Sequence, residues 1–304
     1  MTEATESDLN LKVYLRERLQ LVETAMDRYL PAADASPAHL HEAMRYSVFA
    51  GGKRIRPILM MAACEAVGAD PARVLPAACA IEYIHSYSLI HDDLPAMDDD
   101  DLRRGRPTNH KVYGEAVAIL AGDALLTEAF VLLAHPDFAR TLSADVRSEV
   151  TGIIASAAGS KGMVGGQVVD MESEGKPVDL ETLEYIHACK TGALISAAID
   201  CGAVIGGASA AERQWLKRYG QAAGLAFQVA DDILDIVADQ ELLGKDVGSD
   251  QERGKATYPA LLGLDGARAK ARDLKQQALA ALDDFGPAAQ PLRAIAAYIV
   301  DRSF

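Results

Sequence analysis

The sequence predicts an all-α protein, and three observations support this prediction. Apolar residues recur every three to four positions over most of the 304 residues, which is the period of an amphipathic helix. Many of these stretches are rich in Ala, Leu, Gln, Glu and Lys, the residues that favour helix. Alternation with a period of two, the sign of a half-buried strand, is nearly absent.

The expected helices follow one another along the chain. The first is expected over 11–30, where one stripe contains Leu11, Leu15, Leu19, Val22, Met26 and Leu30. Ser36 and Pro37 are expected to be the N-cap and the first residue of a second helix, which runs to about Phe49 before a Gly-Gly pair stops it. Pro57 lies early in the third. Further helices are expected over 71–94, 111–134, 144–173, 180–206, 209–238, 256–263, 265–284 and 287–301.

Length and composition predict one soluble domain. Half of the residues are hydrophobic, so the chain can bury a large core, and no Pro/Gly/Ser-rich linker or fixed-period repeat divides it. We therefore expect a single domain over 1–304. The acidic, polar N-terminus resembles neither a signal peptide nor a transit peptide, and no run approaches the roughly 18 uninterrupted apolar residues of a membrane span. These features predict a cytoplasmic protein.

Charge and cysteine content exclude several function classes. A net charge of −14 argues against nucleic acid or an anionic membrane as the general partner. An anionic substrate stays open, because local Lys and Arg clusters or bridging divalent cations can bind it. The cysteines lack the spacing of zinc ligands and are expected to be buried thiols; they are Cys64, Cys79, Cys189 and Cys201.

Two acidic clusters each end an apolar helix. In "SLIHDDLPAMDDDDLRRGR", Asp92 and Asp98 are six residues apart, so the backbone must leave the regular helix if both bind one ion. In "DDILD", Asp231 and Asp235 are four apart and share a helix face. An acidic surface loop and an ordinary acidic helix end are the alternatives. Together, the two clusters favour a site for hard, oxygen-bound cations such as magnesium.

Basic residues surround these clusters in the sequence. "AGGKRIRP" places Lys53, Arg54 and Arg56 in a glycine-broken loop that leads into a helix, where an anion is favoured. A basic helix–helix turn is the alternative. The other basic candidates are Arg103, Arg104 and Arg106 after the aspartates, Lys190 beside Thr191, and Lys245 and Lys255, for which solvated lysines are an equal explanation. His85 lies two turns before Asp92 on one helix face, although most single helix histidines are structural.

These motifs occur together in a known family. "GGKRIRP", "SLIHDDLPAMDDDDLRRG", "KTG", "FQVADDILD" and "GKDVGSD…GKATYP" follow the order of the trans-prenyl diphosphate synthases, and the chain resembles that family over about 40–260. It is most similar to the bacterial members that form farnesyl diphosphate. The resemblance implies an antiparallel helical bundle around a deep central cavity, usually a homodimer. It also implies head-to-tail condensation of isopentenyl diphosphate with dimethylallyl and geranyl diphosphate.

The resemblance also implies roles for individual residues. Asp92, Asp98, Asp231 and Asp235 would hold three Mg²⁺ ions, with Asp93 and Asp232 as weaker candidates. The allylic diphosphate would be bound by Arg103, Lys190, Lys245 and Lys255. Isopentenyl diphosphate would be bound by Lys53, Arg56, His85 and Arg104. Thr191 and Gln228 would face the developing cation and, with Lys190, are the implied catalytic residues, whereas no role is implied for Asp99, Asp100 and Asp101.

Product length depends on the floor of the cavity. Tyr87 and Ser88 are the candidates for residues that set product length. Tyr87 lies five positions before Asp92, about 7.5 Å down the helix axis, whereas Ser88 is nearer the Asp92 face by rotation, so Tyr87 must reach the cavity by its size. A Tyr at this place resembles the farnesyl-forming members. Geranyl or geranylgeranyl diphosphate synthase is the nearest alternative. A terpene cyclase would not need "GGKRIRP" with Arg104, and a silent subunit of a heteromeric synthase would be expected to lose one aspartate motif.

Overall fold

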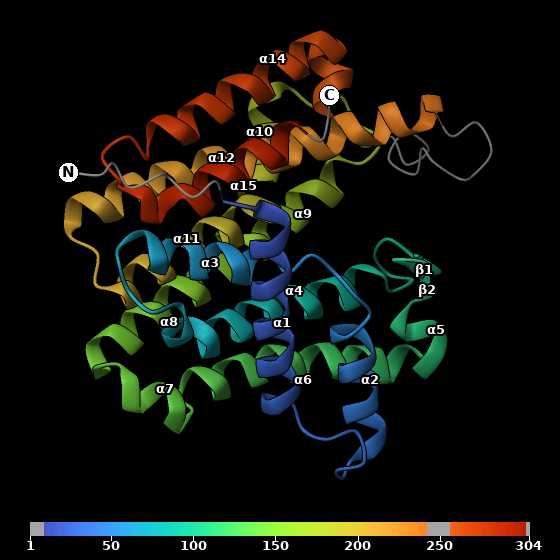
Figure 1. The fold of residues 1–304 in the computed structure, drawn as a ribbon. Coiled ribbons are helices and arrows are strands. Elements are labelled where there is room, and N and C mark those ends of the chain that lie inside the picture. The colour runs from blue at the N-terminus through green and yellow to red at the C-terminus, as the bar shows by residue number, and fades with distance from the viewer. Residues whose placement is uncertain (1–8, 242–255, 302–304) are drawn as a thin grey trace.

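The structure is a computed structural model that describes residues 9–241 and 256–301 (Figure 1). Within these ranges the chain is almost entirely helical, so the all-α prediction is confirmed. The single sheet in the described part was not expected. It is a short hairpin in which β1 (Leu102–Arg103) pairs antiparallel with β2 (Arg106–Pro107), directly after the first acidic cluster.

The first half of the described chain contains α1 (Leu11–Tyr29), α2 (Ala38–Val48), α3 (Ile55–Ala66), η1 (Pro71–Val74), α4 (Leu75–Asp92), α5 (Asn109–Tyr113), α6 (Glu115–Leu133), α7 (Pro136–Thr141) and α8 (Ala144–Ala158). The second half contains α9 (Met163–Ser173), α10 (Leu180–His187), η2 (Ala188–Gly192), α11 (Ala193–Gly206), α12 (Ala210–Glu241), α14 (Tyr258–Ala280), η3 (Pro287–Ala289) and α15 (Gln290–Asp301). The expected helices are therefore present, with differences at their ends and breaks.

These differences follow from local backbone geometry. Pro37 lies outside α2 with an extended backbone, so it is the N-cap residue and not the first helical residue. The expected helix over 111–134 is divided at Gly114. Its φ of 83° is readily adopted by glycine but is strained for other residues. The stretch 144–173 is likewise two helices, α8 and α9. Gly263, with φ 70°, bends α14 where a break between two helices was expected.

The core consists of two apolar clusters joined by α3. α4 packs along α6, α3 along α11, and α12 against both α11 and α14 (Figure 1). One face of α3 contributes Met60 and Cys64 to the cluster around α4 and α6. The opposite face contributes Ile58 and Leu59 to the cluster around α11, α12 and α14. α3 thus connects the helix that ends in the first acidic cluster with the helix that carries the second.

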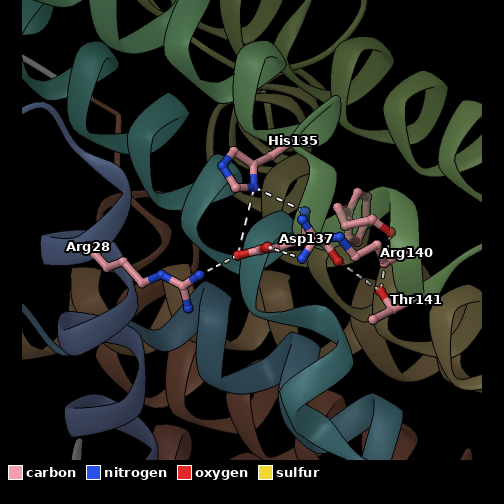
Figure 2. A network of polar contacts seen from close by, with 6 residues as sticks. Arg28, His135, Asp137, Arg140 and Thr141 are labelled. Atoms are coloured by element: carbon pink, nitrogen blue, oxygen red, sulfur yellow. Dashed lines mark hydrogen bonds and ion pairs between the residues drawn. The ribbon is translucent and has the colours of Figure 1, made fainter.

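A polar network fixes the turn that follows α6 to the end of α1. Arg28 on α1 donates to Asp137 of α7 at 2.6 Å, and His135 Nδ1 accepts from the Asp137 backbone N–H at 3.2 Å (Figure 2). The His135 ring also packs edge-on against Tyr29, with ring centroids 5.4 Å apart. Side-chain capping by His135 explains why α7 forms in a segment where sequence periodicity predicted no helix.

Two segments are long and apolar enough to cross a membrane by length and composition, Glu115–Thr141 and Leu180–Gly206. Core helices of a bundle pass the same test. In the fold, 39% and 61% of their most apolar stretches are buried, and these helices pack against α4 and α3.

Candidate active site

The chain turns back on itself after α4 and brings two aspartates together. α4 ends at Asp92, and the Asp98 backbone N–H donates to the Asp92 carbonyl at 2.8 Å. Asp99 takes a left-handed φ of 51° and its N–H donates to the Leu94 carbonyl at 3.1 Å. The backbone therefore leaves the regular helix between Asp92 and Asp98, as a shared ion would require.

The electrostatics at Asp92 favour a cation. Burial and the neighbouring carboxylates of Asp98 and Asp93 raise the pKa of Asp92 to about 6, although Lys190 and Arg103 lower it. In the described part of the chain, no three His, Cys, Asp or Glu side chains alone enclose a metal. The carboxylates of Asp92 and Asp98 therefore fit magnesium, which takes one or two carboxylates from the protein and completes its shell with phosphate oxygens and water.

Arg103 is held in place by the acidic segment that precedes it. Its Nε donates to the buried Asp93 carboxylate at 2.6 Å, and its Nη2 donates to Asp100 at 3.1 Å. Asp101 forms an ion pair with Lys111 at 2.6 Å. Asp93, a weaker candidate for metal binding, is therefore engaged by a guanidinium, and the crowded aspartates include partners for nearby cations.

Lys190 lies in a single turn of π-helix, Ala188–Gly192, where an interruption was expected. Its Nζ donates to Asp170 of α9 at 2.7 Å. Burial opposes the charge of Lys190, but Asp170, Asp92 and Asp98 outweigh it and raise the pKa of this lysine. Asp170 was missed by sequence reasoning, because it begins the acidic run "DMESE" and nothing in that run points to Lys190, 20 residues away.

Thr191 and Gln228 are joined in a chain of hydrogen bonds. Thr191 Oγ1 donates to Gln228 Oε1 at 3.1 Å, and Gln228 Nε2 donates to Asp232 at 3.0 Å. The second oxygen of Asp232 accepts the Tyr258 backbone N–H at the start of α14, also at 3.0 Å. Asp232 is buried, and its two oxygens hold Gln228 and the start of α14 in place.

The other residues of "DDILD" lie on the same helix in different surroundings. Asp231 is half-buried and close enough to Arg56 of α3 that its charge raises the pKa of that arginine, against the larger effect of burial. Asp235 is exposed. The second acidic cluster therefore lies beside the "GGKRIRP" segment. Lys245 and Lys255 lie outside the described residues.

Cations from two segments, the start of α3 and the β1–β2 hairpin, converge around His85. Burial holds the pKa of His85 well below its usual range, and the positive charges of Arg56 and Arg104 lower it further. Arg104 donates to the Gly51 carbonyl, and a Cβ at Gly52 would lie 2.6 Å from its Nη1. Arg56 Nε is buried and has no hydrogen-bond partner among the described residues. Such crowding of like charge is typical of a site for a multivalent anion. Lys53 is exposed on the same loop.

Tyr87 and Ser88 differ in direction. Tyr87 is buried in the apolar cluster between α4 and α6, with its ring centroid 5.7 Å from that of His91. His91 in turn lies directly over Gly122 of α6, where a Cβ would collide with it. Ser88 is half-buried and donates to the carbonyl of His85 on its own helix at 2.9 Å. Of the two, Tyr87 is the bulky group below the aspartates.

An all-α fold that places two acidic clusters next to clustered cations defines a class of enzyme that binds diphosphates. The chain belongs to the polyprenyl synthetase family, whose sequence model matches residues 37–286. It is therefore a trans-prenyl diphosphate synthase, in a family that uses a divalent metal for catalysis.

Individual relatives differ in their products. The chain is 55% identical over 264 residues to the farnesyl diphosphate synthase of Geobacillus stearothermophilus, covering 87% of this chain and 88% of that protein. It is 46% identical over 299 residues to the geranylgeranyl diphosphate synthase of Cyanophora paradoxa, covering 98% of each. The crystal structure of an FPP/GFPP synthase from Zymomonas mobilis superposes with a TM-score of 0.85 at 42% identity, covering 96% of this chain and 99% of that one.

Proposed function

We propose that this protein is a farnesyl diphosphate synthase. It condenses isopentenyl diphosphate head-to-tail with dimethylallyl diphosphate and then with geranyl diphosphate, giving (2E,6E)-farnesyl diphosphate. The observation that carries the proposal is the pair of cations Arg56 and Arg104 around the neutral His85, near the carboxylates of the two acidic clusters. Two anionic substrates need such a pair of neighbouring sites.

Four carboxylates are proposed to hold three Mg²⁺ ions: Asp92, Asp98, Asp231 and Asp235. The raised pKa of Asp92 supports this role, because a bound cation would offset the crowding of like charges. When bound, the ions stabilise the negative charge that develops on the departing diphosphate.

The allylic diphosphate is bound on the side of the first acidic cluster. Lys190 stays charged because Asp170 contacts it, and Arg103 is oriented by Asp93 and Asp100, so both can donate to phosphate oxygens. Lys245 and Lys255 complete this set in the proposal, although they lie outside the described residues. Isopentenyl diphosphate is bound by Lys53, Arg56, His85 and Arg104, where His85 in its neutral form donates one ring N–H.

The reaction breaks the allylic C–O bond and forms a C–C bond to isopentenyl diphosphate, and the departing diphosphate accepts the released proton. Thr191 and Gln228 face the developing carbocation. Because the Thr191 hydroxyl donates its proton to Gln228, its oxygen lone pairs remain directed away from that bond and can stabilise positive charge. Asp232 fixes the amide orientation that this arrangement requires.

One incubation tests the activity. Purified protein is mixed with isopentenyl diphosphate, Mg²⁺ and either dimethylallyl or geranyl diphosphate, and the products are sized by chromatography. A fifteen-carbon product with both primers is expected. A terpene cyclase would instead consume the allylic substrate without isopentenyl diphosphate, and no product with any primer would contradict the synthase activity.

Product length is assigned to Tyr87. Because its ring fills the apolar space between α4 and α6 below Asp92, removal of the ring leaves room for further isoprene units. Tyr87→Ala is therefore expected to shift the main product from fifteen to twenty carbons or more, measured by mass spectrometry. Ser88→Ala, on the adjacent position, serves as the control and should keep the fifteen-carbon product. If Tyr87→Ala makes only farnesyl diphosphate, the floor lies elsewhere.

We further propose that the chain is one domain over 1–304 and acts in the cytoplasm as a homodimer. The exposed side of α6 supports the dimer, because the apolar side chains of Leu120 and Val131 lie on it with Ile119 next to them, although Asp123 and Thr127 lie between them. A stripe of this kind is typical of a surface that another chain covers.

A further inference from the structure

Arg54 is the inward-pointing cation of the basic loop. Its neighbour Lys53 is exposed, whereas the Arg54 side chain is only 1% exposed. Its backbone is left-handed, with φ 50°, directly before α3 begins. This conformation is unfavourable for a residue with a Cβ, so the surrounding contacts must hold it there.

One guanidinium connects the loop to three helices. Arg54 Nη1 donates to Glu82 of α4 at 3.0 Å, and Nη2 donates to the Val48 carbonyl at the end of α2 at 2.6 Å. Nη2 also donates to Glu23 of α1 at 3.3 Å. The Glu82 side chain is itself 3% exposed, so the Arg54–Glu82 ion pair is fully enclosed. The entry into α3 is thereby fixed relative to α1, α2 and α4.

Glu82 also lies within reach of the cation cluster. It precedes His85 by one turn of α4, and its charge raises the pKa of both Arg56 and Arg104 against the larger effect of burial. As an anion near a diphosphate site, Glu82 would on its own weaken substrate binding by repulsion. Its presence there needs another explanation.

We propose that the Arg54–Glu82 ion pair positions the isopentenyl diphosphate site. The pair holds loop 51–55 so that Lys53 and Arg56 converge with Arg104 and His85, and neither member contacts the substrate. This inference rests on the proposed function, in which those four residues bind isopentenyl diphosphate. It assigns a positioning role to Arg54, which the sequence grouped with the anion-binding cations of the loop, and to Glu82, which no motif or charge pattern had marked.

Glu82→Gln is the decisive substitution, because positioning and simple repulsion predict opposite results. If Glu82 acted only as a nearby negative charge, its removal would lower the KM for isopentenyl diphosphate. If it positions the loop, the KM for isopentenyl diphosphate rises about tenfold, because the amide oxygen of glutamine replaces a charge-assisted hydrogen bond to Arg54 by a weaker neutral one. The KM for geranyl diphosphate stays within about twofold, since Lys190 and Arg103 have other partners.

Asp200→Asn is the matched control. Asp200 is buried, accepts two hydrogen bonds from Arg213 at 2.5 and 3.1 Å, and is likewise a carboxylate that loses its charge without changing shape. Both variants should lower the melting temperature, but only Glu82→Gln should change the KM for isopentenyl diphosphate. Equal effects of both variants on that KM would overturn the inference.

Arg54→Lys gives an independent measurement that also serves if Glu82→Gln fails to fold. It keeps the charge but loses the planar fork that bonds Glu82 and the Val48 carbonyl together. Positioning predicts a higher KM for isopentenyl diphosphate, and an unchanged KM would overturn it. If the wild-type protein turns over no isopentenyl diphosphate, the proposed function fails instead, so the two failures are distinct.

Discussion

Two aspartates of "DDILD" stand three residues apart in opposite surroundings. Asp232 is buried and accepts hydrogen bonds from Gln228 and from the Tyr258 backbone N–H, whereas Asp235 is exposed. The family motif assigns both to one acidic cluster. Their contacts separate a residue that supports Gln228 and the start of α14 from one that can reach a metal ion.

Substitution of each aspartate by asparagine tests this difference. Asp232→Asn should lower the free energy of unfolding by about 2 kcal/mol, because a buried carboxylate that accepts one hydrogen bond on each oxygen is replaced by a group with a single acceptor oxygen. In asparagine one of the two acceptor oxygens becomes an NH2 group that faces a donor, so either Gln228 or the start of α14 loses its contact. Loss of the Gln228 contact should also lower kcat. Asp235→Asn should change the free energy of unfolding by less than about 0.5 kcal/mol and raise the Mg²⁺ concentration needed for half-maximal rate. Urea denaturation and a magnesium titration measure these effects, and a destabilised Asp235→Asn would contradict the assignment.

His187 at the end of α10 predicts loss of stability in acid. Burial lowers its pKa from the ordinary 6.5 to about 4, and Lys190 adds to this shift while Asp170 opposes it. Its ring packs against Tyr258, 5.3 Å between centroids. Below pH 6.5 the unfolded chain therefore binds a proton at His187, whereas the folded chain binds it only near pH 4. The free energy of unfolding consequently falls as the pH is lowered from 6.5 to 4.

His187→Phe keeps the ring contact and removes this titration. Between pH 7.5 and pH 5.0 the wild-type protein should lose about 2 kcal/mol more stability than His187→Phe, given the two pKa values. Urea denaturation at both pH values measures the difference, and other titrating groups cancel because both proteins share them. Parallel losses in the two proteins would show that His187 does not titrate in this way.

At the scale of elements, the site depends on the close contact between α9 and the π-helical turn. Gly166 of α9 lies against this turn, and a Cβ there would collide with the Lys190 backbone nitrogen and lie 2.8 Å from Cys189 Cβ. This contact places Asp170 within hydrogen-bond distance of Lys190, whose Nζ and charge the allylic site needs.

Gly166→Ala is therefore expected to separate the two elements. Overpacking of this kind costs about 1–3 kcal/mol, and the displaced Lys190 should lower kcat/KM for geranyl diphosphate about tenfold or more. Gly152→Ala on α8 is the control, because a Cβ there meets nothing within 4 Å and should stabilise the helix slightly. Calorimetry and steady-state kinetics measure both variants. A Gly166→Ala protein as active as the control would show that this contact does not set the position of Lys190.

The sequence predicted the helices well, because amphipathic periodicity depends only on local spacing. The division at Gly114 was not predicted, since apolar residues continue across it and only a backbone angle marks the break. The break before α9 was also missed, although "GSKG" at 159–162 interrupts the apolar pattern. Asp170 and Glu82 were missed for a different reason. Asp170 contacts Lys190, 20 residues along the chain, and Glu82 contacts Arg54, 28 residues away. These pairs meet only in the folded protein, where α9 packs against η2 and α4 against the loop before α3.

The whole molecule combines a strongly acidic chain with a cationic site. The net charge is −14, yet Arg56, Arg104 and Arg103 converge on His85. α3 makes this arrangement possible, because its two faces join both apolar clusters while its first turn carries Arg56. Bound magnesium would add further positive charge where the acidic clusters face the cations. Local charge at the site, not the net charge of the chain, therefore decides which ligands bind.

The exposed apolar face of α6 predicts the oligomeric state. Leu120 is 57% exposed and lies beside Ile119 on this face, so a charge placed there would be buried in the proposed dimer. Leu120→Asp should shift the protein from dimer to monomer, measured by light scattering during size-exclusion chromatography. Tyr298→Asp on α15, where the tyrosine is 40% exposed, is the matched control and should leave the dimer intact. A Leu120→Asp protein that still elutes as a dimer would place the subunit contact on another face. A monomeric wild-type protein would contradict the proposed dimer.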